Sequence, residues 1–315
     1  MRILSLLAVM VLMAFSSVSA EMIKPVGPLY GSTGMVYSPG KLGVISKFES
    51  FKADSYYSDN DKKNYDSSEI NGATRKKVTK LQTTFRYGVM PRFDVRLVMS
   101  HFSKELDRHS AKNSPNGVKH VYMDDSNSGF GDMVAMGRYQ VLSQKAGAPV
   151  FLAVGAGVKM PTGSTSARAD NGKRYPVFLQ SGTGSWDPKV ELGLSKVFDR
   201  FRIDSHTMYT YKTEGEQDTK GGNCLRYNVS GSYALSKAFD VQLELFGRNQ
   251  GKTEVDGEEN DSTGFHNQYL VPGVKVKFAK RSHFGISVPI AINRSTNGEQ
   301  LMEEHRIQAK LALFF

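Results

Sequence analysis

The sequence predicts an all-β protein: a transmembrane antiparallel β-barrel of about twelve strands in a bacterial outer membrane. Three observations predict this fold. The chain begins with a secretory signal, it contains twelve segments in which apolar and polar residues alternate, and the connections between these segments are short and long in turn. A period of two is typical of a strand with one apolar and one polar face. Strands that span a membrane have this pattern because one face meets lipid and the other meets the lumen.

The first twenty residues have the three parts of a signal peptide. Arg2 supplies the positive charge, residues 3–15 are almost all apolar, and Val18 and Ala20 are the small residues before a cleavage site at Glu21. The apolar run is shorter than the roughly 20 residues that a membrane-spanning helix needs. We therefore expect residues 1–20 to be removed after export.

Residues 21–41 are too irregular to form a strand. They contain Pro25, Pro28 and Pro39 among several glycines, and proline cannot donate a hydrogen bond to a β-ladder. Two positions remain open for this segment: it lies in the periplasm, or it enters the lumen as a small plug. The barrel itself is expected to extend over residues 42–315.

Twelve alternating segments follow. In residues 223–235, for example, Tyr227, Val229 and Tyr233 share one face, and Arg226 and Asn228 lie on the other. Each segment has about the 9–11 residues that a tilted strand needs to cross a bilayer. The segments are 42–53, 76–89, 93–104, 129–142, 149–161, 186–197, 201–212, 223–235, 239–249, 265–278, 283–293 and 303–315.

The connections sort by length. Short turns are expected at 90–92, 143–148, 198–200, 236–238 and 279–282, and long polar loops at 53–75, 105–129, 161–185, 213–222, 251–264 and 294–302. A barrel with both ends in the periplasm has an even number of strands, short periplasmic turns and longer extracellular loops. A soluble β-sandwich has no reason to sort its loops in this way.

The chain ends at an aromatic residue, Phe315, on the apolar face of the last segment. This ending resembles the C-terminal signature of outer-membrane barrels that is recognised by the barrel-assembly machinery. Aromatic residues also collect near other strand ends, as in the girdles of such barrels. We expect outer-membrane lipid and the assembly machinery as partners, and a monomeric barrel.

The lumen face is predicted to be basic, since its Lys and Arg outnumber its Asp and Glu about two to one. One interpretation is a path for solutes, because rings of charged side chains bias conduction in pores. The other is a network of ion pairs that fills the barrel, and twelve strands is too intermediate a size to decide. Candidate residues of the path are Arg86, Arg96, Arg138, Lys159, Arg226 and Arg248.

Other classes of function have little support. The net charge of +10 is compatible with binding to nucleic acid. Export from the cytoplasm argues against this function. HExxH, Walker and G-x-S-x-G motifs are missing from the sequence, and neither a metal nor a cofactor is expected. The lone Cys224 cannot form an internal disulfide. An outer-membrane lipid hydrolase with a Ser-His pair is the enzyme alternative, with His206 or His266 as its histidine.

Two motifs carry a resemblance to a known family. The first is Ser128-Gly129-Phe130-Gly131-Asp132, and the second is the run from Gly155 to Gly163, which includes Lys159, Pro161 and Thr162. Together they resemble the outer-membrane protein family named for the meta-cleavage pathway of phenol degradation, whose members are also labelled transporters. The resemblance implies a barrel that passes small compounds, aromatic ones among them. The residues themselves favour structural roles: Gly129 and Gly131 release the chain into a strand, Asp132 caps it, and Pro161 ends another.

The sequence thus favours a passive channel for small polar or aromatic solutes that does no chemistry. The alternative from another class is a closed structural or surface-binding barrel. In that case loops 53–75 and 105–129, which are rich in charged and polar residues, hold the partner.

Overall fold

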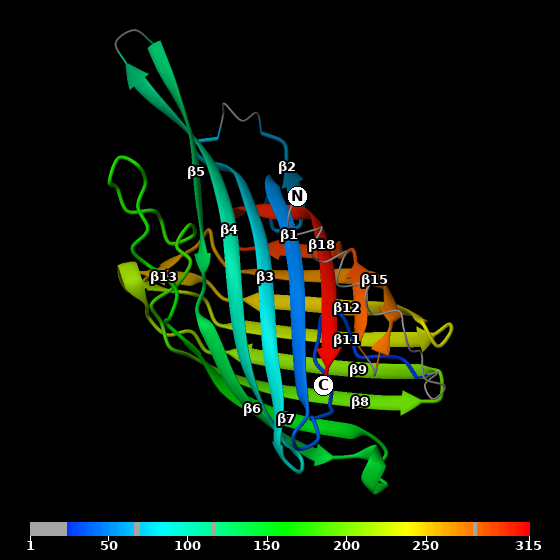
Figure 1. The fold of residues 1–315 in the computed structure, drawn as a ribbon. Coiled ribbons are helices and arrows are strands. Elements are labelled where there is room, and N and C mark those ends of the chain that lie inside the picture. Colours follow the sequence, from blue (N-terminus) through cyan, green and yellow to red (C-terminus); the bar gives the residue numbers. More distant parts are fainter. Residues whose placement is uncertain (1–23, 66–69, 115–116, 280–281) are drawn as a thin grey trace.

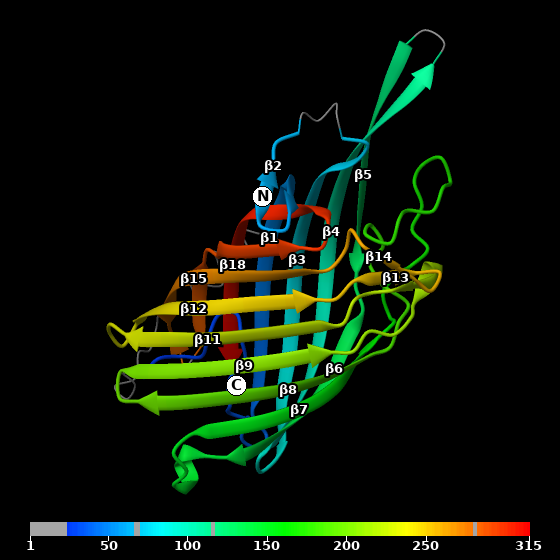
Figure 2. The same cartoon turned by 180° about the vertical axis from the view of Figure 1, so that it is seen from behind.

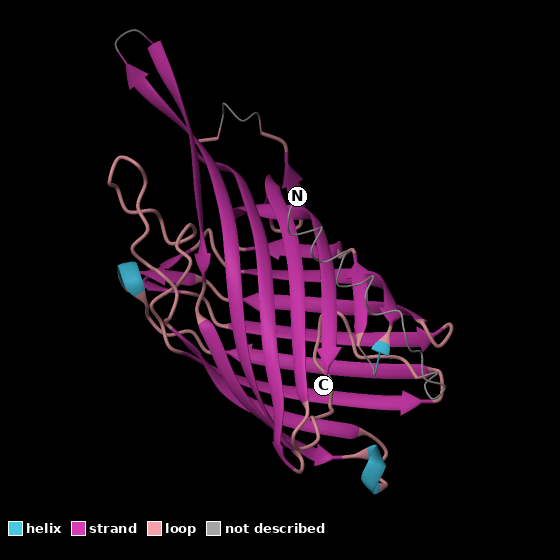
Figure 3. Cartoon of the chain, in the orientation of Figure 1, coloured by secondary structure: helices cyan, strands magenta, loops and turns pink. Residues whose placement is uncertain are grey.

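The computed structural model describes residues 24–65, 70–114, 117–279 and 282–315, and their regular secondary structure is almost entirely strand (Figure 3). The predicted signal peptide, residues 1–20, lies outside these ranges. The wall strands are β1 (Leu42–Ser58), β3 (Gly72–Met90), β4 (Phe93–Ser114), β6 (Met133–Leu142), β7 (Phe151–Met160), β8 (Asp187–Phe198), β9 (Phe201–Thr210), β11 (Cys224–Ala234), β12 (Phe239–Gln250), β15 (Phe265–Lys277), β16 (His283–Ser287), β17 (Ile290–Thr296) and β18 (Glu299–Phe314).

Smaller elements decorate the loops and turns. They are β2 (Asp61–Lys63), β5 (Gly117–Phe130), β10 (Thr219–Lys220), β13 (Thr253–Val255), β14 (Glu258–Asn260) and the single-turn 3-10 helices η1 (Gln144–Ala146) and η2 (Glu216–Asp218). Over the described ranges, no helix has both the length and the apolar character that a membrane span requires.

The wall strands close into one antiparallel barrel (Figures 1 and 2). Successive strands pair with each other, and the first strand, β1, pairs with the last, β18, from Gly43↔Phe314 to Ser58↔Glu299. Because β16 and β17 occupy one strand position, the described residues form twelve positions, as predicted. Closure leaves the sheet without an outer edge, which is what a membrane-spanning sheet requires.

The two faces of the wall are inverted relative to a soluble protein. Large apolar side chains stand exposed on the outside, among them Val229, Leu243 and Ile290, each about half exposed. Charged side chains such as Arg138, Lys275 and Asp94 are fully buried inside. An apolar outer surface around a polar lumen is the arrangement of an outer-membrane barrel, and the protein is one.

Exposed aromatic rings mark the turn end of the wall. Phe198 and Phe201 face each other across the β8–β9 turn, with ring centroids 6.1 Å apart. Tyr233 is the register partner of Phe201 on β11. Phe315 is also exposed, and its backbone N–H donates to the carbonyl of Leu42 at 2.9 Å, so the C-terminus completes the β1–β18 seam. Rings at this level suit the lipid headgroup zone.

The expected loop 105–129 is instead a β-hairpin. β4 continues to Ser114 and pairs with β5 from His101↔Phe130 to Ser114↔Gly117, so the hairpin rises well beyond the wall (Figure 1). The prediction of a loop was wrong because the polar residues here alternate with other polar residues. Strand pairing needs only backbone groups, whereas alternation identifies a strand only when one of its faces is apolar.

The prediction of a long loop over residues 294–302 is also wrong. A tight turn at Asn297 and Gly298 joins β17 directly to β18, and Gly298 has φ of 61°. Glycine adopts this left-handed conformation without steric cost.

Below this turn the wall strand is interrupted at Pro289, which separates β16 from β17. In the described ladder β17 pairs with β15 alone, while β16 pairs with both β15 and β18. The Arg294 guanidinium donates to the carbonyl of Glu303 at 2.9 Å. This side chain therefore supplies a donor to β18 where β17 makes no ladder with it.

We predict that Val229→Arg, at the middle of the lipid-facing side of β11, lowers the free energy of unfolding by about 2–4 kcal/mol. The measurement is a denaturant titration of the barrel folded into phospholipid vesicles. Val229→Ala controls for lost side-chain volume, and Asn260→Arg in an exposed loop controls for added charge. Equal stability of the two arginine variants would contradict the assignment of this face to lipid.

Candidate functional site

The N-terminal segment, residues 24–41, enters the lumen and leaves it again at the end of the barrel that carries the short turns. At one end, Lys277 of β15 donates to the carbonyl of Lys24 at 3.3 Å. At the other end, Gly88 near the β3–β4 turn exchanges backbone hydrogen bonds with Gly40 and Lys41. The segment thus enters and leaves at the same rim, which the short turns assign to the periplasm.

Acidic and hydroxyl side chains of the wall accept the backbone N–H groups of this segment. The N–H of Val26 donates to Asp240 at 2.8 Å, and the N–H of Leu29 donates to Glu244 at 2.6 Å. Gly34 and Tyr37 donate to Ser195 and Asp94 in the same way, each at 2.8 Å. Gly34 lies directly against the backbone of β7 and β8, where a Cβ would collide with Phe151 and Ser195.

Basic and amide side chains donate to the carbonyl groups. Lys310 donates to Pro28 at 2.6 Å and Arg138 to Thr33 at 2.5 Å. The remaining donors of this kind are Lys47 to Tyr30, Lys275 to Val26 and Gly27, Gln308 to Leu29, Gln140 to Gly34, and Arg86 and Arg138 to Met35. Since three prolines in the segment have no N–H, carbonyls outnumber amide donors, and the wall needs more cations than anions.

Two tyrosines of the segment pack on wall side chains. The Tyr37 ring lies 4.1 Å from the Arg86 guanidinium, and the Tyr30 ring lies 4.7 Å from that of Phe246. Burial raises the pKa of both phenols above the usual value of 10.0, so both hydroxyls stay protonated at neutral pH.

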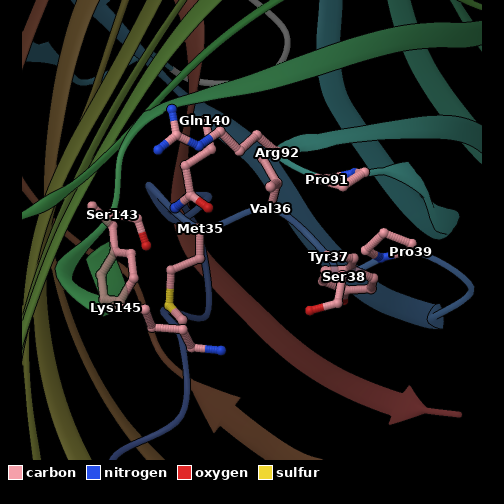
Figure 4. A pocket seen from close by; sticks show the side chains of 11 residues that line it. Met35, Val36, Tyr37, Ser38, Pro39, Pro91, Arg92, Gln140, Ser143 and Lys145 are labelled. Carbon is pink, nitrogen blue, oxygen red and sulfur yellow. The ribbon is translucent and has the colours of Figure 1, made fainter.

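A cavity of about 580 Å³ extends from Tyr30, Gly31 and Ser32 toward the extracellular loops. These three residues form its floor. A smaller cavity of about 230 Å³ lies on the periplasmic side of the segment, between Met35–Pro39 and the β3–β4 turn (Figure 4). The N-terminal segment therefore lies between these two cavities.

The larger cavity is strongly basic. Its described lining has two acidic side chains, Glu49 and Glu303, against ten basic ones: Lys47, Lys76, Lys80, Arg86, Arg96, Lys189, Arg226, Arg248, Arg306 and Lys310. Aromatic rings line it as well: Tyr30, Phe51, Phe102, Phe178, Tyr227, Phe246, Phe265 and Tyr269. Several cations lie over these rings, for example Arg306 at 4.8 Å from the ring of Phe51.

The six arginine and lysine residues predicted for the solute path divide into three groups. Arg86 and Arg96 line the cavity but are paired with the buried carboxylates of Asp94 and Glu191. Arg226 and Arg248 line the cavity and make no ion pair in the described part of the chain.

Arg138 and Lys159 do not line the larger cavity. Arg138 is buried below the floor, 2.5 Å from Glu191. Lys159 lies at the loop end of β7, 2.9 Å from Asp132 and 3.0 Å from Asp187.

The two family motifs meet in one polar cluster beside Lys159. Besides the lysine, Asp132 accepts hydrogen bonds from the N–H of Gly163 and the N–H of Thr183, each at 3.0 Å. The hydroxyl of Thr162 accepts from the N–H of Met133 at 2.9 Å.

Tight backbone packing accompanies these bonds. Gly163 packs on the backbone of Gly182, Gly131 packs against Phe102, and Gly129 lies beside the Ser181 side chain. The cluster joins the ends of β5, β6 and β7 to the loop between Pro161 and Trp186.

A family model described as "Putative MetA-pathway of phenol degradation" matches residues 71–311, which is most of the chain. The chain belongs to this family. Its model spans both motifs and all wall strands from β3 to β17, as well as most of β18. No curated protein sequence matches the chain.

Among solved structures, an outer membrane channel from Pseudomonas putida F1 is similar, with a TM-score of 0.59 and 15% identity over 92% of this chain and 100% of that one. At this identity the likeness concerns the fold. A FadL homologue from Pseudomonas aeruginosa has a TM-score of 0.41 and 10% identity over 88% of this chain and 90% of that one. The monoaromatic hydrocarbon channel CymD has a TM-score of 0.45 and 8% identity over 88% of each chain.

The histidines of the enzyme alternative lie apart. The Nε2 of His206 lies 3.0 Å from a carboxylate oxygen of Glu191 inside the lumen, and that of His266 lies 3.2 Å from the hydroxyl of Tyr227. Neither of these contacts is a Ser-His pair. Cys224 is buried and unbonded to another cysteine. The described residues contain no group of three or more His, Cys, Asp or Glu placed to hold a metal ion.

The sequence left open whether the N-terminal segment enters the lumen, and the aromatic surface beside the cavity floor was not predicted. Tyr30, Phe246 and Tyr269 form a run of rings, with centroids 4.7 and 5.9 Å apart. One signal was present, because Phe246 shares a face with Asp240, Gln242 and Glu244, where a large apolar residue is out of pattern.

We predict that Glu244→Gln loosens the N-terminal segment, because Glu244 accepts from both Leu29 and Tyr30. A hydrogen bond to a charged acceptor contributes about 1.5–3 kcal/mol, so the amides of Leu29 and Tyr30 should exchange with deuterium roughly 10- to 100-fold faster. The matched control is Glu258→Gln, which removes a carboxylate from an exposed loop. Unchanged exchange in Glu244→Gln would contradict this anchoring.

We also predict that Asp132→Asn releases the loop between Pro161 and Trp186, because an amide cannot take an ion pair with Lys159 while accepting two backbone N–H groups. Limited proteolysis of the folded barrel should cut this loop faster, at Arg168, Lys173 or Arg174. Asp170→Asn, in the same loop but outside the cluster, is the control. Equal cutting of both variants would argue against the cluster as a clamp.

Proposed function

We propose that the protein is a passive outer-membrane channel for small polar or aromatic solutes, and that it does no chemistry. The observation that carries the proposal is the larger cavity, in which ten cations face two carboxylates within a closed barrel. Positive charge at the wall of a water-filled pore attracts anions and repels cations.

The N-terminal segment is the constriction of this channel. It forms the floor of the larger cavity and separates it from the periplasmic one. Apart from the backbone bonds of Gly40 and Lys41 to Gly88, its described contacts with the wall are hydrogen bonds to wall side chains. Such a segment can shift by exchanging a few hydrogen bonds while the wall stays intact.

The nature of the solute is supported by the lining and by the family. Rings and cations together suit solutes that have both a flat apolar part and a polar part. The family description names phenol degradation, which agrees with aromatic compounds as cargo.

A second candidate, a surface-binding barrel, is favoured by one feature, the β4–β5 hairpin that extends beyond the wall (Figure 1). Removing residues 106–125 with a short connection should leave conductance unchanged if the hairpin serves only surface binding. Loss of conductance on this deletion would instead assign the hairpin to the channel.

The experiment that tests the channel is single-channel recording of the refolded chain without residues 1–20 in a planar bilayer. We predict discrete steps, a reversal potential that indicates anion preference, and larger or more frequent openings in an Asp240→Asn, Glu244→Gln variant. Folding is checked beforehand by heat-modifiable mobility in gels. Silence from folded protein and from the loosened variant would overturn the proposal.

A further inference from the structure

Two arginines lie side by side on the wall of the larger cavity, and neither makes an ion pair with a carboxylate of the described residues. Arg226 of β11 and Arg248 of β12 are direct register partners, and like charges in this arrangement are destabilising. Other arginines of the cavity are neutralised, for example Arg306, which lies 2.6 Å from Glu303. Within the described residues, Arg226 and Arg248 have no carboxylate at ion-pair distance, and Glu49 acts on Arg226 only from farther away. Both guanidinium groups contact the thiol of Cys224, and Arg248 also donates to the neutral amide of Gln250.

The strand registers show what surrounds this pair. On the same face, Met208 of β9 lies beside Arg226, and Asn267 of β15 lies beside Arg248. One step toward the periplasm, the corresponding row includes Asn228, Phe246 and Tyr269. Two residues along a strand correspond to about 6.6–6.8 Å. The arginine row therefore lies above the aromatic row by a distance similar to the length of one small aromatic molecule.

The aromatic row forms a continuous surface. Tyr30 of the cavity floor packs on Phe246, and Phe246 stacks on Tyr269 with an interplanar angle of 28°. On the opposite side of the arginines, Phe265 lies with its ring centroid 5.0 Å from the Arg248 guanidinium. The pair thus lies between the aromatic row on the periplasmic side and Phe265 and Cys224 on the loop side.

We propose that Arg226 and Arg248 bind the carboxylate of small aromatic acids, whose ring lies on the surface formed by Tyr30, Phe246 and Tyr269. A guanidinium can hold a carboxylate through two parallel hydrogen bonds. An anion between two guanidinium groups attracts both of them and thereby offsets their mutual repulsion. The cavity of about 580 Å³ is within the usual range for small-molecule sites. This inference rests on the proposed function and narrows its cargo, since neutral phenols and hydrocarbons lack the charge that the pair would bind.

The test is isothermal titration calorimetry of the refolded chain without residues 1–20 in detergent, with benzoate, benzamide and acetate as probes. We expect benzoate to bind at least tenfold more tightly than benzamide, which lacks the charge, and than acetate, which lacks the ring. In the Arg226→Gln, Arg248→Gln variant, benzoate affinity should fall by roughly 30-fold or more, because two charged hydrogen-bonding groups are lost. Benzamide affinity should change little.

The matched control is Lys119→Gln, Lys237→Gln, which removes two exposed charges outside the cavity and should bind benzoate as the parent does. Equal affinity for benzoate and benzamide, or unchanged benzoate binding in the arginine variant, would overturn the inference. These outcomes are independent of conductance. Benzoate binding without channel steps would contradict the proposed function alone, and anion conductance without benzoate binding would contradict the aromatic-acid site alone.

Discussion

The structure depends on one constraint: an irregular backbone inside a barrel must find a hydrogen-bond partner for each of its polar groups. Residues 24–41 have no helix or ladder to provide partners, so the wall provides them as side chains. Carboxylates such as Glu244 accept from N–H groups, and cations such as Lys310 donate to carbonyls. Much of the buried charge in the lumen is therefore explained by the segment that it holds.

This constraint divides the lumen in two. Near the periplasmic rim, most charges have a partner in the segment or in the wall, as Arg138 has in Thr33 and Glu191. On the extracellular side of Tyr30 the segment is absent, and the basic side chains of the wall face the larger cavity. The same basic wall thus has two roles. It fixes the constriction on one side and leaves an anion-attracting space on the other, where Arg226 and Arg248 make no ion pair with the described residues.

Much of the fold follows from the sequence because strand alternation and the sorting of loop lengths are local properties. The twelve strand positions and the family motifs were accessible in this way. The β4–β5 hairpin was not, since its residues are polar on both faces, and the turn at Asn297 and Gly298 was hidden in a polar stretch. The site was predictable only in part. Alternation places Arg138 and Arg226 on the same face, but it does not reveal that Arg138 binds Thr33 while Arg226 faces a cavity. That difference comes from a segment distant in sequence.

The position of the N-terminal segment is the central claim, and disulfide trapping tests it most directly. Leu29 lies against Gly285 of β16, so a Leu29→Cys, Gly285→Cys variant in a Cys224→Ser background should bring its two thiols close enough to join. Purified outer membranes would be analysed by mass spectrometry with and without reductant. We predict a disulfide between the two introduced cysteines in the assembled barrel, and none when Gly285→Cys is combined with Ser236→Cys at an exposed turn. Two free thiols in a folded barrel, both open to a bulky maleimide from the periplasmic side, would contradict a segment anchored in the lumen.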